Sequence, residues 1–191
     1  MGKDFLQLFR EREALLEGHF GLTSGRHSPT YLQCAMVLQY PEIAREIGKE
    51  LAAMADGDID LVVSPAVGGI VVGHETASNL GVRAIFSERV DGEMTFRRGF
   101  YVKPGERILA VEDVVTTGGS IREAALLAEK MGGDLVATAS IAHRYTDKPT
   151  PPTDRPHHSL LQIHAPAYDP ADCPLCKEEI PLQKPGSRTL R

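Results

Sequence analysis

Apolar residues follow two different spacings along this chain of 191 residues. Short uninterrupted apolar runs, which are typical of buried strands, alternate with stretches whose apolar residues recur at helical spacing. The runs predict strands over 59–64, 83–87, 108–111, 135–141 and 160–164, and the spacing predicts helices over 3–17, from Pro41, over 69–80 and from Ile121. Because strands that alternate with helices form a parallel sheet with right-handed crossovers, we expect an α/β fold. Ligand sites are expected at the carboxyl ends of its strands.

The segments between these elements are rich in turn-forming residues. Residues 18–29 contain Gly, Ser and His and predict a loop or an irregular hairpin, and residues 88–99 form a polar connection. Residues 146–156 hold four of the thirteen prolines, which indicates a turn-rich connection rather than a domain linker. We expect a single domain over residues 1–191: an N-terminal part over about 1–40, an α/β core over about 41–164 and an irregular tail over about 165–191.

Composition excludes several classes of protein. A net charge of −5 argues against a nucleic-acid surface, because binding to a phosphate backbone requires a basic face. No apolar stretch approaches the length of a membrane span, and the N-terminus lacks the pattern of a signal peptide. Three cysteines in such a chain suggest a reducing compartment rather than a disulfide framework. We expect a cytoplasmic protein without membrane or nucleic-acid partners.

The most informative segment joins the strand over 108–111 to the helix near Ile121. The strand ends in two adjacent carboxylates, Glu112 and Asp113, and a turn follows, Thr116-Thr117-Gly118-Gly119-Ser120. Glycine lets the backbone approach a ligand closely, and N–H groups at a helix start bind anions. Carboxylates accept hydrogen bonds from sugar hydroxyls. Plain connections in α/β proteins also contain such turns, but the ordered combination of acid pair, turn and helix favours a sugar-phosphate site.

A second loop follows the strand over 59–64. Its sequence, Ser64-Pro65-Ala66-Val67-Gly68-Gly69, leads directly into the predicted helix over 69–80. Consecutive backbone N–H groups in such a loop can form a nest for an anion. Taken alone, the segment is better explained as an ordinary connection between strand and helix.

The acid pair and its turn resemble the phosphoribosyl pyrophosphate (PRPP) signature of the type I phosphoribosyltransferases. The resemblance implies a central, mostly parallel sheet flanked by helices, with an N-terminal hood that covers the base. It also implies that Glu112 and Asp113 hold the ribose hydroxyls and that the loop containing Val67 and Gly68 binds pyrophosphate. The turn would bind the 5′-phosphate, so the implied PRPP contacts also include Val114, Val115, Thr116, Thr117, Gly118, Gly119 and Ser120.

The N-terminal segment is similar to the orotate branch of this family. Its Ser24-Gly25-Arg26-His27-Ser28-Pro29 core matches the hood, and Arg144 follows the strand over 135–141 where orotate enzymes carry an arginine. The planar guanidinium suits a carboxylate or a carbonyl. The resemblance implies orotate contacts by Thr116, Arg144, Tyr31 and Leu32. A phosphoribosyltransferase for a purine or another base, and a regulator that binds PRPP without catalysis, remain as alternatives.

The resemblance also implies a mechanism and partners. Ribose 5-phosphate would pass from PRPP to orotate with Mg²⁺ as cofactor, giving orotidine 5′-monophosphate for pyrimidine (UMP) biosynthesis, in a homodimer. The catalytic set would be Glu112, Asp113 and Arg89. The catalytic loop of the family corresponds to residues 88–99, where Arg89 is near a familiar basic position and Arg97 and Arg98 supply further charge. Its altered sequence indicates a divergent subfamily, and we expect this loop to close as a lid.

A cysteine pair lies in the tail. Cys173 and Cys176 have the spacing of half a zinc site, and His157, His158 and His164 lie upstream. A single pair of this kind is weak evidence, since two reduced thiols packed in the tail give the same pattern. Zinc binding by Cys173 and Cys176 therefore stays one of two interpretations.

Overall fold

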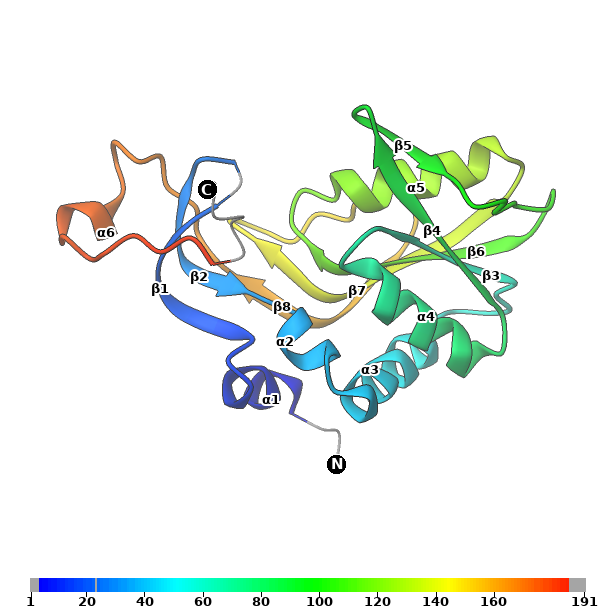
Figure 1. The fold of residues 1–191 in the computed structure, drawn as a ribbon, viewed down its shortest axis with the longest axis horizontal. Coiled ribbons are helices and arrows are strands. Elements are labelled where there is room, and N and C mark those ends of the chain that lie inside the picture. Colours follow the sequence, from blue (N-terminus) through cyan, green and yellow to red (C-terminus); the bar gives the residue numbers. More distant parts are fainter. Residues whose placement is uncertain (1–3, 23, 186–191) are drawn as a thin grey trace.

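A six-stranded sheet forms the centre of the protein, seen in a computed structural model that describes residues 4–22 and 24–185. Its strand order is β5-β4-β3-β6-β7-β8, and every pair is parallel except the hairpin of β4 and β5 (Figure 1). The strands are β3 (Leu61–Pro65), β4 (Arg83–Val90), β5 (Glu93–Phe96), β6 (Arg107–Val115), β7 (Asp134–Tyr145) and β8 (His157–His164). This confirms the expected α/β fold with a mostly parallel sheet.

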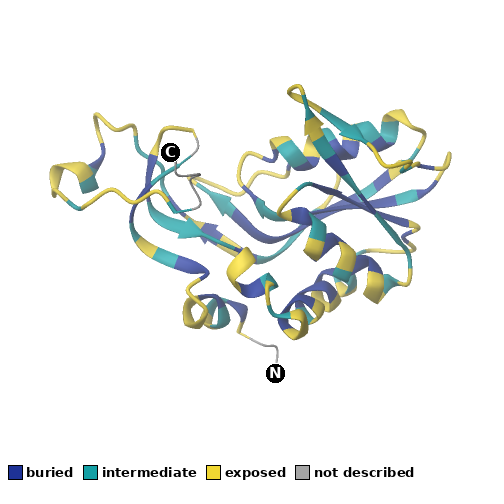
Figure 2. Ribbon diagram, in the orientation of Figure 1, coloured by how far each residue is buried: buried dark blue, intermediate teal, exposed yellow. Residues whose placement is uncertain are grey.

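Helices cover both faces of the sheet. On one face lie α1 (Phe5–Glu11), α3 (Pro41–Ala53) and α4 (Gly69–Leu80), and on the other lies α5 (Gly119–Lys130). Strand β6 supplies both cores, because Leu109 and Val111 face the first group while Ile108 and Ala110 face α5. All four side chains are fully buried, and Figure 2 shows the central strands in the dark blue of buried residues. Burial on both faces explains why these strands have uninterrupted apolar sequences.

The hood is a separate two-stranded sheet of β1 (Leu15–Gly21) and β2 (His27–Leu32). Short helix α2 (Ala35–Leu38) then leads to α3. The described part of the tail, residues 165–185, contains α6 (Pro174–Lys177) and runs beside the hood (Figure 1). Isolated bridges join Phe20 to Gln183 and His27 to Tyr168. The first and last segments of the described chain therefore build one subdomain together.

Two predicted elements were wrong. The helix expected over 3–17 ends at Glu11, and Leu15 and Leu16 instead pair with β2 as part of β1. Residues 88–99 are mostly hairpin rather than loop, because β4 continues to Val90 and β5 begins at Glu93. The turn between them is Asp91-Gly92, both with positive φ, which is a preferred sequence for a tight hairpin.

Several other predictions were confirmed. The helix over 69–80 is α4, Pro41 opens α3, and residues 18–29 form most of the hood hairpin. The predicted strands lie within or close to β3, β4, β6, β7 and β8. Among the described residues, no helix combines the length and the apolar character that crossing a membrane requires.

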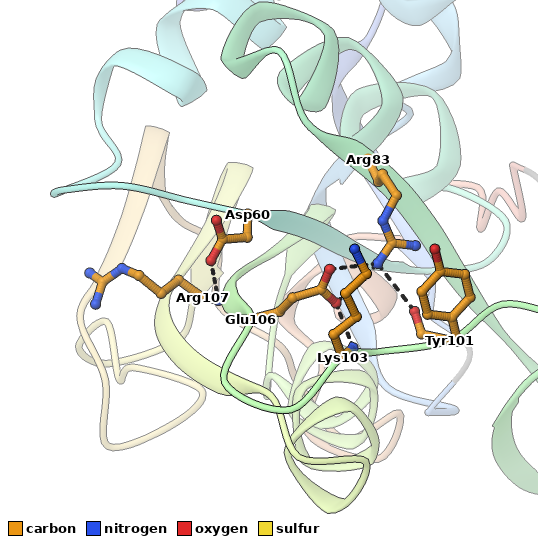
Figure 3. Close-up of polar contacts among 6 residues, drawn as sticks. All are labelled: Asp60, Arg83, Tyr101, Lys103, Glu106 and Arg107. Carbon is orange, nitrogen blue, oxygen red and sulfur yellow. Dashed lines mark hydrogen bonds and ion pairs between the residues drawn. The ribbon is translucent and has the colours of Figure 1, made fainter.

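Charged residues at the amino ends of the strands form a paired network (Figure 3). Arg83 Nη2 lies 2.8 and 3.0 Å from the two carboxylate oxygens of Glu106, which also accepts from the Lys103 backbone N–H at 2.7 Å. The Arg83 guanidinium stacks 4.3 Å from the centre of the Tyr101 ring. Although burial raises the pKa of Glu106, these donors hold it below its usual value. The carboxylate of Glu106 at this edge of the sheet is therefore paired with a charged group and a backbone donor.

Candidate active site

The acid pair lies on β6 beyond the point where β3 stops pairing with it. Pairing with β3 ends at Ala110, whereas pairing with β7 continues and sets Glu112 opposite Ser140. The turn then leads into α5, whose N-cap, Gly118, has a φ of 75°. A Cβ at Gly118 would come within 2.4 Å of the Pro152 Cβ, so both the conformation and the space require glycine.

Burial raises the pKa of both carboxyl groups of the acid pair. It raises the pKa of Glu112 to about 8, helped by the charge of Asp113 and opposed by the Ile121 backbone N–H that donates to Glu112. Burial also raises the pKa of Asp113, although the Val114 N–H donates to its Oδ1 at 2.9 Å. Neither carboxylate has an ion-pair partner among the described residues. A buried, unpaired acid pair favours cations or hydroxyl donors.

The loop after β3 meets the acid pair. Gly68 lies so close that a Cβ there would be 2.5 Å from Asp113 Oδ2. The neighbouring Ala66–Val67 peptide is cis, and the Val67 side chain is 81% exposed. Gly68 therefore lies beside the acid pair, with no room for a side chain at position 68.

A cavity of about 1100 Å³ opens at the carboxyl end of β7. The hood, the turn after β6, the connection after β7 and the tail all contribute to its walls. Four cationic side chains line it, and they are Arg26, Arg144, Lys148 and Lys184. The only acidic lining residue in the described chain is Asp147. The cavity therefore suits anionic ligands.

Arg144 connects the core to the hood. Its Nη2 donates to Ser28 Oγ at 2.9 Å, while its buried Nε has no hydrogen-bond partner in the described chain. Burial lowers the pKa of Arg144 from its ordinary value, but a guanidinium stays charged at neutral pH. An unpaired buried donor of this kind is costly unless a ligand accepts from it.

Six other predicted contact residues divide into two groups, and Gly119 and Ser120 open α5. Tyr31, Thr116 and Thr117 line the cavity. The pKa of Tyr31 is raised by burial and by the charge of Asp113, because this side chain of the hood lies close to the acid pair. The side chains of Val114, Val115 and Leu32 instead pack in the hydrophobic clusters, so the valines offer a ligand only their backbone.

Comparison with known proteins identifies the family. Residues 35–159 match the model of the phosphoribosyl transferase domain. The orotate phosphoribosyltransferase of Chlorobium phaeobacteroides (strain BS1) is 52% identical over 186 residues, which cover 97% of this chain and 95% of the relative. That of Thermotoga maritima is 46% identical, with 97% and 98% covered. The chain belongs to the orotate phosphoribosyltransferase family.

Solved structures agree with this family assignment at the level of the fold. The orotate phosphoribosyltransferase of Aeropyrum pernix superposes with a TM-score of 0.65, covering 82% of this chain and 92% of that one. Its sequence identity is 19%, so this likeness shows a shared architecture only. The type I phosphoribosyltransferase fold expected from the PRPP signature is thereby confirmed.

The arginines predicted to serve an orotate phosphoribosyltransferase lid form ion pairs here. Arg89 Nη2 lies 2.7 Å from Glu123 Oε2 on α5, and Arg98 Nη2 lies 2.9 Å from Glu88 Oε1. Neither lines the large cavity. The catalytic and PRPP-binding roles of Arg89 stay predictions, and they require this side chain to leave Glu123.

Two cationic side chains of the cavity were not predicted as site residues. Lys148 lies in the proline-rich connection after β7, and Lys184 lies in the tail. The signal available in the sequence was weak, since an isolated lysine in a polar loop is usually a solvated surface residue. Only the tertiary fold brings Lys184 of the tail to the same cavity as residues of β7.

The cysteine pair lies away from its predicted partners. Cys173 and Cys176 are in the tail, close to the hood residues His19 and His27. By contrast, His157 bonds to Thr138 and Ser140 within the main sheet, 2.9 and 3.2 Å away. Its pKa is lowered to about 4 by burial and by the charges of His143 and His158. In the described chain, none of the three upstream histidines on β8 belongs to the group of metal-binding atoms around the cysteines.

Proposed function

We propose that this chain transfers the ribosyl 5-phosphate group of PRPP to N1 of orotate, giving orotidine 5′-monophosphate and pyrophosphate. As a member of the orotate phosphoribosyltransferase family, it is a pentosyltransferase of pyrimidine biosynthesis. The observation that carries the assignment is the arrangement of its site. A cation-lined cavity with an unpaired arginine N–H lies beside a buried acid pair on the strand that leads into α5.

PRPP would lie across the ends of β3 and β6. The N–H groups at the start of α5 and the hydroxyls of Thr116 and Thr117 would bind the 5′-phosphate. The loop at Gly68 would bind pyrophosphate, and the acid pair would accept from the ribose hydroxyls. Proximity of that loop to Asp113 supports this placement, because one PRPP molecule must reach both.

The acid pair also suits Mg²⁺. Carboxylate oxygens are ligands that this hard cation prefers, and burial without an ion-pair partner leaves Glu112 with a pKa of about 8. Bound with PRPP, Mg²⁺ would neutralise charge on the pyrophosphate. Glu112 and Asp113 would hold it directly or through its water, and either arrangement stabilises the ionised form of the pair.

Orotate would bind in the cationic cavity. Arg144 offers its free Nε–H to a carboxylate or carbonyl oxygen, and Tyr31 brings the hood over the same space. The positive potential of Lys148 and Lys184 favours an anionic base over an uncharged purine. Catalysis is then chiefly the alignment of the ring nitrogen with the anomeric carbon in a preorganised charge field.

The test is the loss of orotate absorbance after PRPP and Mg²⁺ are added. Orotate should be consumed, whereas adenine, xanthine and uracil should not. The variant Arg144→Lys keeps the charge but loses the guanidinium fork. It should raise the KM for orotate more than the KM for PRPP. Consumption of another base in preference to orotate would contradict the proposal.

The lid and the dimer belong to the same proposal. Hairpin β4–β5 would supply Arg89 to pyrophosphate on closure, either in its own subunit or across a homodimer. Mixing Arg89→Ala chains with chains that lack the acid pair distinguishes the two routes. Activity recovered in the mixture, together with a dimer in sedimentation, supports exchange across the interface.

A further inference from the structure

Four side chains with metal-binding atoms meet where the tail crosses the hood. They are His19 on β1, His27 on β2, Cys173 at the N-cap of α6 and Cys176 within α6, and their ligand atoms all lie within 4.8 Å of one another. His19 Nε2 is 2.9 Å from His27 Nδ1 and 3.7 Å from each cysteine Sγ. Cys176 Sγ is 3.3 Å from His27 Nδ1.

Three of these distances, 3.3, 3.7 and 3.7 Å, match the edges of a tetrahedral site, and the 2.9 Å between the two histidine nitrogens is shorter than such an edge. Zinc bonds of about 2.0–2.1 Å to nitrogen and about 2.3 Å to sulfur require ligand atoms about 3.3–3.8 Å apart. We infer that His19, His27, Cys173 and Cys176 bind one Zn²⁺ ion. Two thiolates with two imidazoles form a ligand set that selects zinc over the oxygen-preferring Mg²⁺ of the proposed reaction. The magnesium and zinc sites therefore use different chemistry.

The surroundings of His19 support a built site. His19 is 1% exposed, His27 is buried and Cys173 is fully buried, whereas Cys176 is the exposed member of the cluster. His19 Nδ1 lies 2.7 Å from the Ile180 carbonyl oxygen and donates its N–H there. That bond leaves the lone pair of Nε2 directed at the other three ligands, which is the usual outer contact of a zinc-bound histidine.

Four protein ligands close the coordination shell, so the ion is structural. Its effect is to fasten the tail to the hood, where backbone bonds already join His27 to Tyr168 at 2.8 and 2.9 Å. Hood and tail together form a wall of the cationic cavity through Leu22, Arg26 and Lys184. Zinc thus holds in place a wall of the base-binding space, and its presence does not depend on which base is used.

Metal content is the direct test. The full chain, expressed with zinc and dialysed, should contain about one zinc per chain by elemental mass spectrometry. Cys176→Ser and His19→Gln should each lower that value to a small fraction. His164→Gln, which removes an exposed histidine of β8, and Cys34→Ser, which removes the remaining cysteine, should leave it unchanged.

A second measurement avoids dependence on variants that misfold. Wild-type protein stripped by a strong chelator should lose thermal stability and gain two thiols reactive toward a disulfide reagent. Added Zn²⁺, and not Mg²⁺, should reverse both changes, and Co²⁺ should give the visible spectrum of a tetrahedral thiolate site. A wild type without metal, a Cys173–Cys176 disulfide, or zinc that persists in both variants would overturn the inference. None of these readouts involves turnover, so failure here leaves the proposed function intact.

Discussion

At the amino edge of the sheet, Glu106 is neutralised by an arginine at 2.8 Å and a backbone N–H at 2.7 Å. At the carboxyl edge, Glu112 and Asp113 are buried without a cationic partner among the described residues, and the pKa of Glu112 rises to about 8. All three carboxylates lie on β6 or directly beside it, so the difference in pairing comes from the residues that surround each edge. The paired charges at the amino edge stabilise the fold. The unpaired carboxylates at the carboxyl edge are suited to a ligand that supplies the missing positive charge.

The largest test removes the unpaired charges. The double variant Glu112→Gln with Asp113→Asn should fold normally and lose transfer by about a thousandfold or more, because ribose and Mg²⁺ lose their acceptors. Orotate consumption measures activity and circular dichroism measures the fold. Undiminished turnover would remove the acid pair from the mechanism.

Crowding one carboxylate is the next test. Gly68→Ala places a Cβ 2.5 Å from Asp113 Oδ2, so the loop or the carboxylate must shift. We expect kcat/KM for PRPP to fall by about 10- to 100-fold. Val71→Ala, which truncates an exposed side chain on α4, is the control and should match wild type. Equal kinetics in the two variants would show that the loop does not meet PRPP.

The amino edge should respond in stability instead of activity. Arg83→Ala leaves the buried Glu106 with fewer donors and should lower the free energy of unfolding by about 1–3 kcal/mol, measured in urea. Arg83→Lys should lose less, because it keeps a charge near the carboxylate. Both variants should retain wild-type kcat. A stable Arg83→Ala protein with impaired catalysis would reverse the roles assigned to the two edges.

The pH dependence of stability also distinguishes the two edges. The folded-state pKa of Glu112 is raised to about 8, so the folded state binds the extra proton and this group costs stability as pH rises from about 4.5 to about 8. Glu112→Gln should therefore raise the melting temperature more at about pH 8.5 than at about pH 5.5. The pKa of Glu106 is lowered, so its contribution has the opposite sign and is lost as pH falls. A gain in Glu112→Gln that is independent of pH would contradict the raised pKa.

Local patterns in the sequence predicted the core well and placed the acid pair at a strand end, whereas PRPP binding there stays a prediction. Strand runs, the opening of α3 at Pro41 and the acid pair with its turn all depend on neighbouring residues, and the fold preserves them. The error over residues 3–17 has a physical cause. Leu15 and Leu16 continue the helical spacing of α1, but pairing with Tyr31 and Leu32 in β2 prevails over that local preference.

Partners distant in sequence could not be predicted in the same way. The cysteine pair was recognisable, but His19 lies 154 positions from Cys173, and no local spacing joins the hood to the tail. Lys184 is likewise far in sequence from the residues of β7 that line the same cavity. The Asp91-Gly92 turn is different, because its sequence already favoured a hairpin within residues 88–99.

The bridges from Phe20 to Gln183 and from His27 to Tyr168 also bear on the order of assembly during translation. The hood emerges early from the ribosome with one flank uncovered, and the α/β core can collapse while the last segment is still in the exit tunnel. Only after synthesis has passed Pro185 can residues 165–185 dock on the hood and complete the wall of the cationic cavity. A nascent chain is thus able to bury its core before the walls of that cavity are complete.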